Sequence, residues 1–188
     1  MANYNKKMTA TAIRLGEVRF SYAHVFERRR DEDGGEGKYS VCVLVPKTDK
    51  QALDMIAAAI EAAKQDGKTK KWGGKIPANC KIPLRDGDID HEDDETFKGM
   101  MFFNASSNSQ PGIRVLAGGV VSEAIDDSDF YSGCYGAVTV NFFPFEASGN
   151  KGVAVGLNNV IKTRDGDKLA GGSSAESDFA DLADDALN

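Results

Sequence analysis

The chain has 188 residues, of which 41% are hydrophobic, and its 29 acidic and 23 basic side chains give a formal net charge of −6. This length and apolar content suffice for one elaborated domain with its own core. No apolar run is long enough to cross a bilayer, and the first residues lack the apolar stretch of a secretion signal, so we expect a cytoplasmic protein.

The first elements along the chain are two strands joined by an arginine-rich loop. Residues 11–26 and 38–45 are rich in β-branched and aromatic residues, which favours extended structure. Alternation makes one face of the second strand clearly apolar and the other only partly so. The connecting loop begins with Arg28, Arg29 and Arg30 and continues with acids and glycines, which predicts an irregular excursion.

One helix is predicted over residues 49–65, where apolar residues recur at helical spacing. Thr48 and Gln51, three positions apart, fit a capping box at its start. Gly67 is a typical residue for ending a helix. We expect this helix to pack on the sheet.

Two adjoining blocks of opposite charge follow the helix. Residues 64–85 hold seven Lys or Arg and one acid, Asp66, whereas residues 86–95 hold seven acids and no Lys or Arg. Glycines and prolines are frequent in the first block, so this region is expected to be an irregular excursion before the next strand.

Four further strands are predicted, at residues 99–105, 113–121, 136–145 and 153–163. Residues 147–152 separate the last two and include two glycines and an asparagine, which can take positive φ. The last two strands are therefore expected to form an antiparallel hairpin. Six extended stretches and one helix indicate a mainly β protein.

The last twenty residues are acidic and contain no Lys or Arg. Without their five acids, the rest of the chain has 24 acidic and 23 basic residues, so most of the net charge lies in this segment. A block of like charge with little to bury cannot offset the entropy cost of ordering. We expect a folded domain over residues 1–168 and a flexible acidic tail over residues 169–188 that is free to contact a basic surface.

Cations and aromatic rings occur together in two places. Trp72, the only tryptophan, lies among the lysines and glycines of residues 68–75, and Tyr22 and Tyr39 flank the arginine-rich loop. Cations along a backbone path and rings on which bases stack are what sequence-tolerant binding of a single strand requires. The sequence is compatible both with an exposed Trp72 and with a Trp72 packed in the core.

Metal and catalytic motifs are missing from the sequence. A calcium loop starting at Asp86 would need Gly at position six and Glu at position twelve, where His91 and Phe97 stand. The three cysteines show no paired zinc spacing and suit unpaired, buried thiols. The sequence has no phosphate-binding P-loop and no obvious nucleophile with a partner base, so we expect no cofactor, no metal and no enzymatic activity.

Four segments occur in an informative order: KIPLRDGD at residues 81–88, GMMFFNASS at 99–107, YSGCY at 131–135 and SGNKGVAVGLNNV at 148–160. With these segments and the acidic tail, the chain resembles bacteriophage single-stranded DNA-binding proteins with an OB-fold core. The resemblance implies a mainly β fold, an OB-fold-like Greek-key barrel with inserted loops and one main helix, followed by a disordered tail.

The resemblance also implies a function. Such a protein protects exposed single-stranded DNA in phage DNA replication, recombination or repair, in the cytoplasm of the host bacterium. Its tail contacts replication proteins such as a DNA polymerase or a helicase, and also occupies the strand-binding groove when DNA is absent. The tail residues assigned to these contacts are Asp178, Phe179, Asp181, Asp184 and Asp185. The chain departs from the family pattern in ending on Leu187-Asn188 rather than on an aromatic residue, and in placing its helix after the second strand.

Candidate DNA-binding residues follow from the cations and rings. Those expected to neutralise phosphates are Arg28, Arg29, Lys70, Lys71, Lys75 and Arg114. Those expected to stack on bases are Tyr22, Phe26, Tyr39, Trp72, Phe103 and Tyr131. Two other functions stay open: a phage structural or interaction protein with buried aromatics, and a metal-dependent nuclease whose carboxylates are Asp86, Asp88, Asp90 and Asp93.

Overall fold

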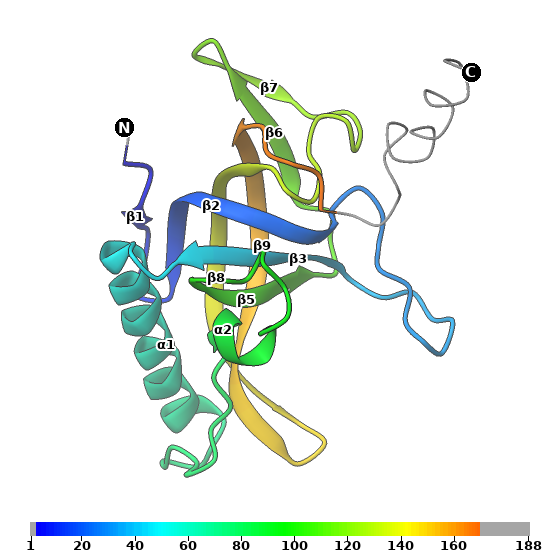
Figure 1. Ribbon diagram of the computed structural model, residues 1–188. Helices are drawn as coiled ribbons and strands as arrows, with labels where there is room; N and C mark the ends of the chain where they lie inside the picture. Colours follow the sequence, from blue (N-terminus) through cyan, green and yellow to red (C-terminus); the bar gives the residue numbers. More distant parts are fainter. Residues whose placement is uncertain (1–2, 170–188) are drawn as a thin grey trace, which may run out of the picture.

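The computed structural model describes residues 3–169, and five strands form a closed ring in it (Figure 1). They are β2 (Ala12–His24), β3 (Tyr39–Pro46), β5 (Met100–Ser107), β8 (Tyr135–Ala147) and β9 (Asn150–Arg164). β2 pairs antiparallel with β3 and β8, β3 with β5, and β8 with β9. A parallel pair between Ser106 and Gly156 closes β5 on β9. Because the third barrel strand neighbours the fifth, the connection is a Greek key, and the predicted OB-fold-like barrel is confirmed.

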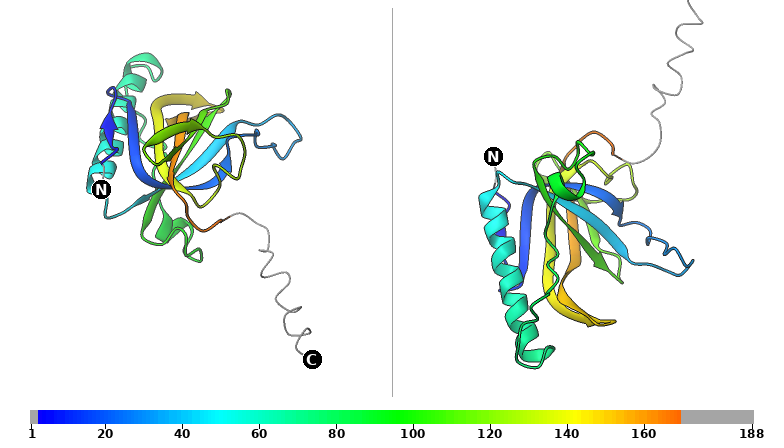
Figure 2. Two further views of the ribbon diagram at one scale, coloured as in Figure 1. Left: turned by 90° about the horizontal axis from the view of Figure 1, so that it is seen from above. Right: turned by 60° about the horizontal axis from the view of Figure 1, so that its bottom comes forward.

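The other elements lie outside this ring. They are β1 (Lys6–Lys7), α1 (Lys50–Lys70), β4 (Arg85–Asp86), α2 (Gly87–Asp90), β6 (Gly112–Ala117) and β7 (Val120–Glu123). α1 lies along one side of the barrel, and the arginine-rich loop between β2 and β3 projects from the opposite side (Figure 2). The β8–β9 hairpin, predicted from its turn residues, extends beyond the barrel (Figure 1).

One predicted strand, residues 113–121, is a hairpin in the structure. β6 and β7 pair antiparallel, and Gly118 and Gly119 make the turn with φ of 57° and 78°. Only glycine adopts such positive φ without a steric cost, so these two residues permit the reversal. β6 also pairs with β9, so the hairpin extends the sheet past the ring.

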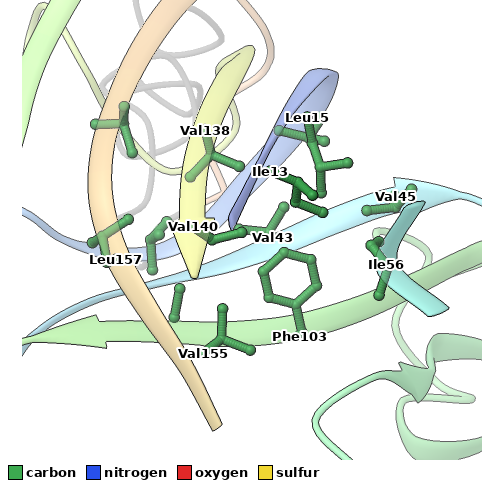
Figure 3. Packing of buried hydrophobic residues seen from close by; sticks show 14 of the residues in the cluster. Ile13, Leu15, Val43, Val45, Ile56, Phe103, Val138, Val140, Val155 and Leu157 are labelled. Carbon is green, nitrogen blue, oxygen red and sulfur yellow. The ribbon is translucent and has the colours of Figure 1, made fainter. Parts of the chain in front are cut away.

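Branched and aromatic side chains fill the barrel interior. Val43, Val140, Leu157 and Phe103 meet there, each at most 4% exposed (Figure 3). Full burial of a side chain of this size contributes about 1.5–3 kcal/mol. The stacking role predicted for Phe103 is wrong, because β5 directs this ring into the core and its neighbour Phe102 to the outer face.

α1 differs from its prediction at both ends. Its N-cap is Asp49 rather than Thr48, and the Asp49 carboxylate accepts a hydrogen bond of 3.0 Å from the N–H of Ala52. The helix continues through Gly67 to Lys70. Gly67 is needed for packing rather than for termination, because a Cβ there would lie 2.6 Å from the ring of Trp72.

Trp72 is part of the core. Its side chain is 6% exposed, and its Nε1–H donates a hydrogen bond of 3.3 Å to the carbonyl of Phe145 on β8. The exposed, base-stacking role considered for Trp72 is therefore wrong. The ring instead fixes residues 68–81, which we call the lysine loop, against the β8–β9 hairpin.

Neither helix among residues 3–169 combines the length and hydrophobicity of a membrane span. All three cysteines are unpaired thiols: Cys42 and Cys134 are buried, and Cys80 is half-buried. Burial raises the pKa of Cys42 to about 12 and that of Cys134 to about 11, so both thiols are neutral at pH 7.

Candidate nucleic-acid interface

A groove of about 680 Å³ lies on the outer face of β3 and β5, beside the arginine-rich loop. Its position follows from strand alternation, because Val41, Val43 and Val45 point into the barrel while the intervening residues point out. In OB-fold proteins, the face of the second and third barrel strands and the loops beside it bind oligonucleotides. β3 and β5 are those two strands here.

The open floor of the groove is neutral and polar. The register of β3 and β5 places Ser40 opposite Ser106 and Cys42 opposite Asn104. Serine hydroxyls and an asparagine amide can hydrogen-bond to bases without favouring one charge. The Cys42 thiol is held neutral by the burial that raises its pKa, so it places no negative charge against a phosphate.

The far end of the groove is apolar and covered. Leu44 lies opposite Phe102, and Phe97, which comes from the segment after α2, packs over both. His91 stacks on Phe97 with ring centroids 4.0 Å apart. The acidic segment, residues 86–97, therefore bounds the groove at its apolar end, where Arg85 stays exposed, and leaves the polar end open.

Tyr22 stands at the edge of this groove with an exposed ring. A register shift interrupts the pairing of β2 with β3 between Ser21 and His24, and Tyr22 has φ of 46° within it. A left-handed conformation costs a non-glycine residue about 1–3 kcal/mol, and such strain is concentrated at functional sites. The bulge leaves the Tyr22 side chain 59% exposed. This ring is available to stack on a base.

Three cations and two acids line the groove: Arg29, Lys38 and Arg85, with Asp31 and Glu36. Arg29 and Lys38 form no ion pair within the described part of the chain, so both can contact a phosphate. Arg85 is held from two sides, since its Nε donates a 2.7 Å hydrogen bond to Asp90 and its guanidinium lies 5.4 Å from the centre of the Phe102 ring.

Arg28 holds the arginine-rich loop, which flanks the groove, in place. Its guanidinium donates a 2.7 Å hydrogen bond to the carbonyl of Asn108, lies 3.5 Å from Glu36 and covers the Tyr39 ring at 5.4 Å. These contacts tie the arginine-rich loop to the end of β5. Tyr39 is half-buried under Arg28, and both residues are next to the groove rather than in it.

Three other predicted contacts lie away from the groove. Phe26 is half-buried against the core, and Arg114 is exposed on β6. The hydroxyl of Tyr131 donates a 2.7 Å hydrogen bond to Asp165. Burial, followed by this contact with the carboxylate, raises the pKa of Tyr131.

The predicted phosphate contacts Lys70, Lys71 and Lys75 are all exposed. They belong to the end of α1 and the lysine loop, which Trp72 fixes on the β8–β9 hairpin. The structure therefore separates the predicted phosphate contacts: Arg29 lines the groove, whereas Lys70, Lys71 and Lys75 lie away from it.

Sequence reasoning missed several groove residues. Lys38, Ser40, Asn104 and Ser106 carry no motif, and their shared signal is outward position on β3 and β5. Arg85 belongs to the basic block, and nothing in the sequence alone assigns it to the groove. Register and strand order were needed to bring these residues together.

The start of the acidic segment is held by ion pairs with Lys47, which follows β3. The ammonium of Lys47 lies 2.6 Å from both Asp86 and Asp88, and its hydrogen bond to Asp88 lowers the pKa of that carboxyl. No group of three or more His, Cys, Asp or Glu side chains within residues 3–169 is arranged to hold a metal ion. Asp86 and Asp88 instead fix, through Lys47, the segment that carries Phe97 over the apolar end of the groove.

Comparison with known proteins agrees with this geometry. The solved structure of the single-stranded DNA-binding protein of bacteriophage Enc34 in complex with single-stranded DNA has a TM-score of 0.76 and 26% identity, over 90% of this chain and 96% of that one. The single-stranded DNA-binding protein gp2.5 of bacteriophage T7 shares the fold, with a TM-score of 0.51 and 17% identity over 94% of each chain. Protein p50 of Acyrthosiphon pisum secondary endosymbiont phage 1 is 32% identical over 91% of this chain and 94% of its own.

The family assignment rests on nearly the whole length of the chain. The family model described as "Enterobacter phage Enc34, ssDNA-binding protein" matches residues 11–187. That match includes every barrel strand, the groove and the lysine loop. The chain belongs to the Enc34 phage family of non-enzymatic single-stranded DNA-binding proteins.

Proposed function

We propose that this single-stranded DNA-binding protein protects exposed strands during phage DNA replication, recombination or repair, by holding them in the groove over β3 and β5. The observation that carries the proposal is the combination in one groove of a neutral polar floor, the exposed Tyr22 ring and the cations Arg29 and Lys38, which form no ion pair within residues 3–169. Stacking accepts every base and backbone cations accept every sequence, which suits a protein that must cover any strand.

The experiment that tests this is a binding titration with a fluorescently labelled oligo-dT of about 30 nucleotides, several times an OB-fold site. Trp72 is buried, so the label rather than intrinsic fluorescence should report binding. Log affinity is expected to fall with log salt by about 0.7 for each phosphate neutralised. Duplex DNA of equal length is the comparison. Absence of salt-sensitive binding below about 200 mM, or equal affinity for duplex, would contradict the proposal.

A second part of the proposal concerns the acidic tail, whose assigned residues 178–185 lie outside the described residues. The described chain ends close to the groove: the N–H of Leu169 donates a 2.9 Å hydrogen bond to the carbonyl of Ser132, and Leu169 lines a small cavity with Tyr22 and His24. A polyanion tethered there has a high effective concentration at the groove and competes with phosphates.

Removing residues 176–188 is therefore expected to tighten binding of oligo-dT at low salt. Unchanged or weaker affinity would contradict competition by the tail. The same tail is proposed to recruit replication proteins such as a DNA polymerase or a helicase. Pull-down of the phage or host polymerase should succeed with the full chain and fail after truncation.

A further inference from the structure

The lysine loop, residues 68–81, is a strongly charged surface outside the groove. Lys68, Lys71, Lys75 and Lys81 are exposed and form no ion pair within residues 3–169. Such a concentration of unpaired positive charge attracts a polyanion, and the attraction needs no readout of sequence.

The lysine loop is anchored to the rest of the protein at both ends and is not a freely moving surface loop. Trp72 is buried beneath it and donates its hydrogen bond to Phe145, which fixes one end to β8. At the other end, the N–H of Lys81 donates a hydrogen bond of 3.0 Å to the carbonyl of Lys151. The N–H of Val153 donates one of 2.9 Å to the carbonyl of Lys81. Lysines held on an anchored backbone lose less entropy on binding than lysines on a free loop.

A short extended segment joins this surface to the groove. Lys81 bridges to Gly152 on β9, while Arg85 and Asp86 pair with β5 as strand β4. Residues 81–86 thus run from the hairpin to the groove lining, a path of at most about 20 Å for six extended residues. Arg85 lines the groove and Lys81 belongs to the lysine loop, so cations mark both ends of the path.

We propose that the lysine loop is a second, phosphate-binding surface that holds the same single strand after it leaves the groove over β3 and β5. The loop offers no exposed ring of its own, since Trp72 faces inward, so it binds backbone and not bases. The inference rests on the proposed function of the groove and extends it: short strands fill the groove alone, and longer ones also engage the loop.

The chain's own acidic tail is the competing occupant, and its starting point lies nearer to the groove than to the lysine loop. The described chain ends at Leu169 against Ser132, just before β8 begins, whereas Phe145 and Lys151 lie at the hairpin end of β8 and β9. β8 has 13 residues, so about 40 Å separate its two ends. The tail starts beside the groove, and the lysine loop lies at the opposite end of the hairpin.

The test is a matched pair of triple variants of the full chain. The loop variant is Lys71→Gln/Lys75→Gln/Lys81→Gln, and the control is Lys6→Gln/Lys7→Gln/Lys50→Gln, which removes the same charge from exposed lysines at β1 and at the start of α1. Affinity is measured for labelled oligo-dT of about 8 and about 30 nucleotides across a salt series, the short one chosen to fill a single OB-fold site.

The affinity of the loop variant for the short strand is expected to stay within about twofold of wild type. Its affinity for the long strand is expected to fall roughly tenfold or more. Its salt slope on the long strand should fall by about 2, since three phosphate contacts contribute about 0.7 each. The control should keep the wild-type length dependence.

Three results would overturn the inference. Equal losses of affinity for both oligonucleotides would mean a general effect of charge. Unchanged affinity for both would mean that the lysine loop does not contact the strand. A gain in affinity on both lengths, absent after removal of residues 176–188, would assign the loop to the tail. If wild type itself bound neither oligonucleotide, the groove proposal would fall first, so the two failures are distinguishable.

Discussion

At the scale of single residues, the groove depends on side chains whose direction is set by local backbone. Tyr22 is exposed because the β2 bulge gives it a φ of 46°. Phe102 and Phe103 are consecutive, yet one faces the groove and the other the core. Successive side chains along any strand point to opposite faces, so such a separation is expected. Alternation could not say which member faces inward, because both neighbours are apolar and the answer depends on strands far away in sequence.

Replacing Tyr22 by alanine should weaken binding of oligo-dT by about 1–3 kcal/mol, the value of one stacked base. Folding stability should change little, because the side chain is exposed. Tyr22→Phe keeps the ring and is the matched control. Wild-type affinity for Tyr22→Ala, measured by fluorescence anisotropy, would remove this ring from the interface.

Arg28 and Arg29 are neighbours with different expected roles. Arg29→Gln should lower the salt slope of binding by about 0.7, because a phosphate contact is lost. Arg28→Gln should weaken binding through a looser loop and leave the slope unchanged, since Arg28 already binds Asn108 and Glu36. Salt series on both variants distinguish the two. A lowered slope for Arg28→Gln would show that it contacts the strand directly.

At the scale of elements, spacing predicted α1 well and its C-terminal end poorly. Apolar periodicity is local and survives in the structure as the buried face of Ala52, Ile56, Ile60 and Ala63. The end of the helix depends on Trp72 and on its partner Phe145 of β8, which lies 73 residues further along the chain. No local pattern contains that contact. The Gly118-Gly119 turn of the β6–β7 hairpin is local, and its two glycines were a signal the strand prediction passed over.

Gly67→Ala tests how packing competes with helix propensity. Alanine normally stabilises a helix interior by about 1 kcal/mol relative to glycine. Here the new Cβ would lie 2.6 Å from the Trp72 ring and 2.8 Å from Pro144. Such overpacking costs about 1–3 kcal/mol of folding stability, which should outweigh the gain in helix propensity. Urea unfolding should show a lower midpoint. Gln65→Ala, on the exposed face, is the control and should change little.

At the scale of the whole molecule, the charge pattern was readable from the sequence and its placement was not. In the sequence, Trp72 lies among the lysines of the basic block, which places a ring beside cations. The structure buries that ring and separates the lysine loop from the groove, because the chain between them crosses from the β8–β9 hairpin to β5. The closed order of the barrel strands also depends on pairings between distant segments. The resemblance to phage single-stranded DNA-binding proteins supplied that order, and composition alone indicated only a mainly β protein.

The measurement that tests the central claim most directly places one charge on the groove floor. Asn104 is exposed at the middle of β5, and a glutamate there would oppose phosphates without entering the core. Ser122→Glu adds the same charge on the exposed strand β7 and serves as the control. Titrated with oligo-dT of about 30 nucleotides, Asn104→Glu should lose roughly tenfold or more in affinity while Ser122→Glu stays near wild type. Wild-type affinity for Asn104→Glu would contradict the assignment of DNA to the face of β3 and β5.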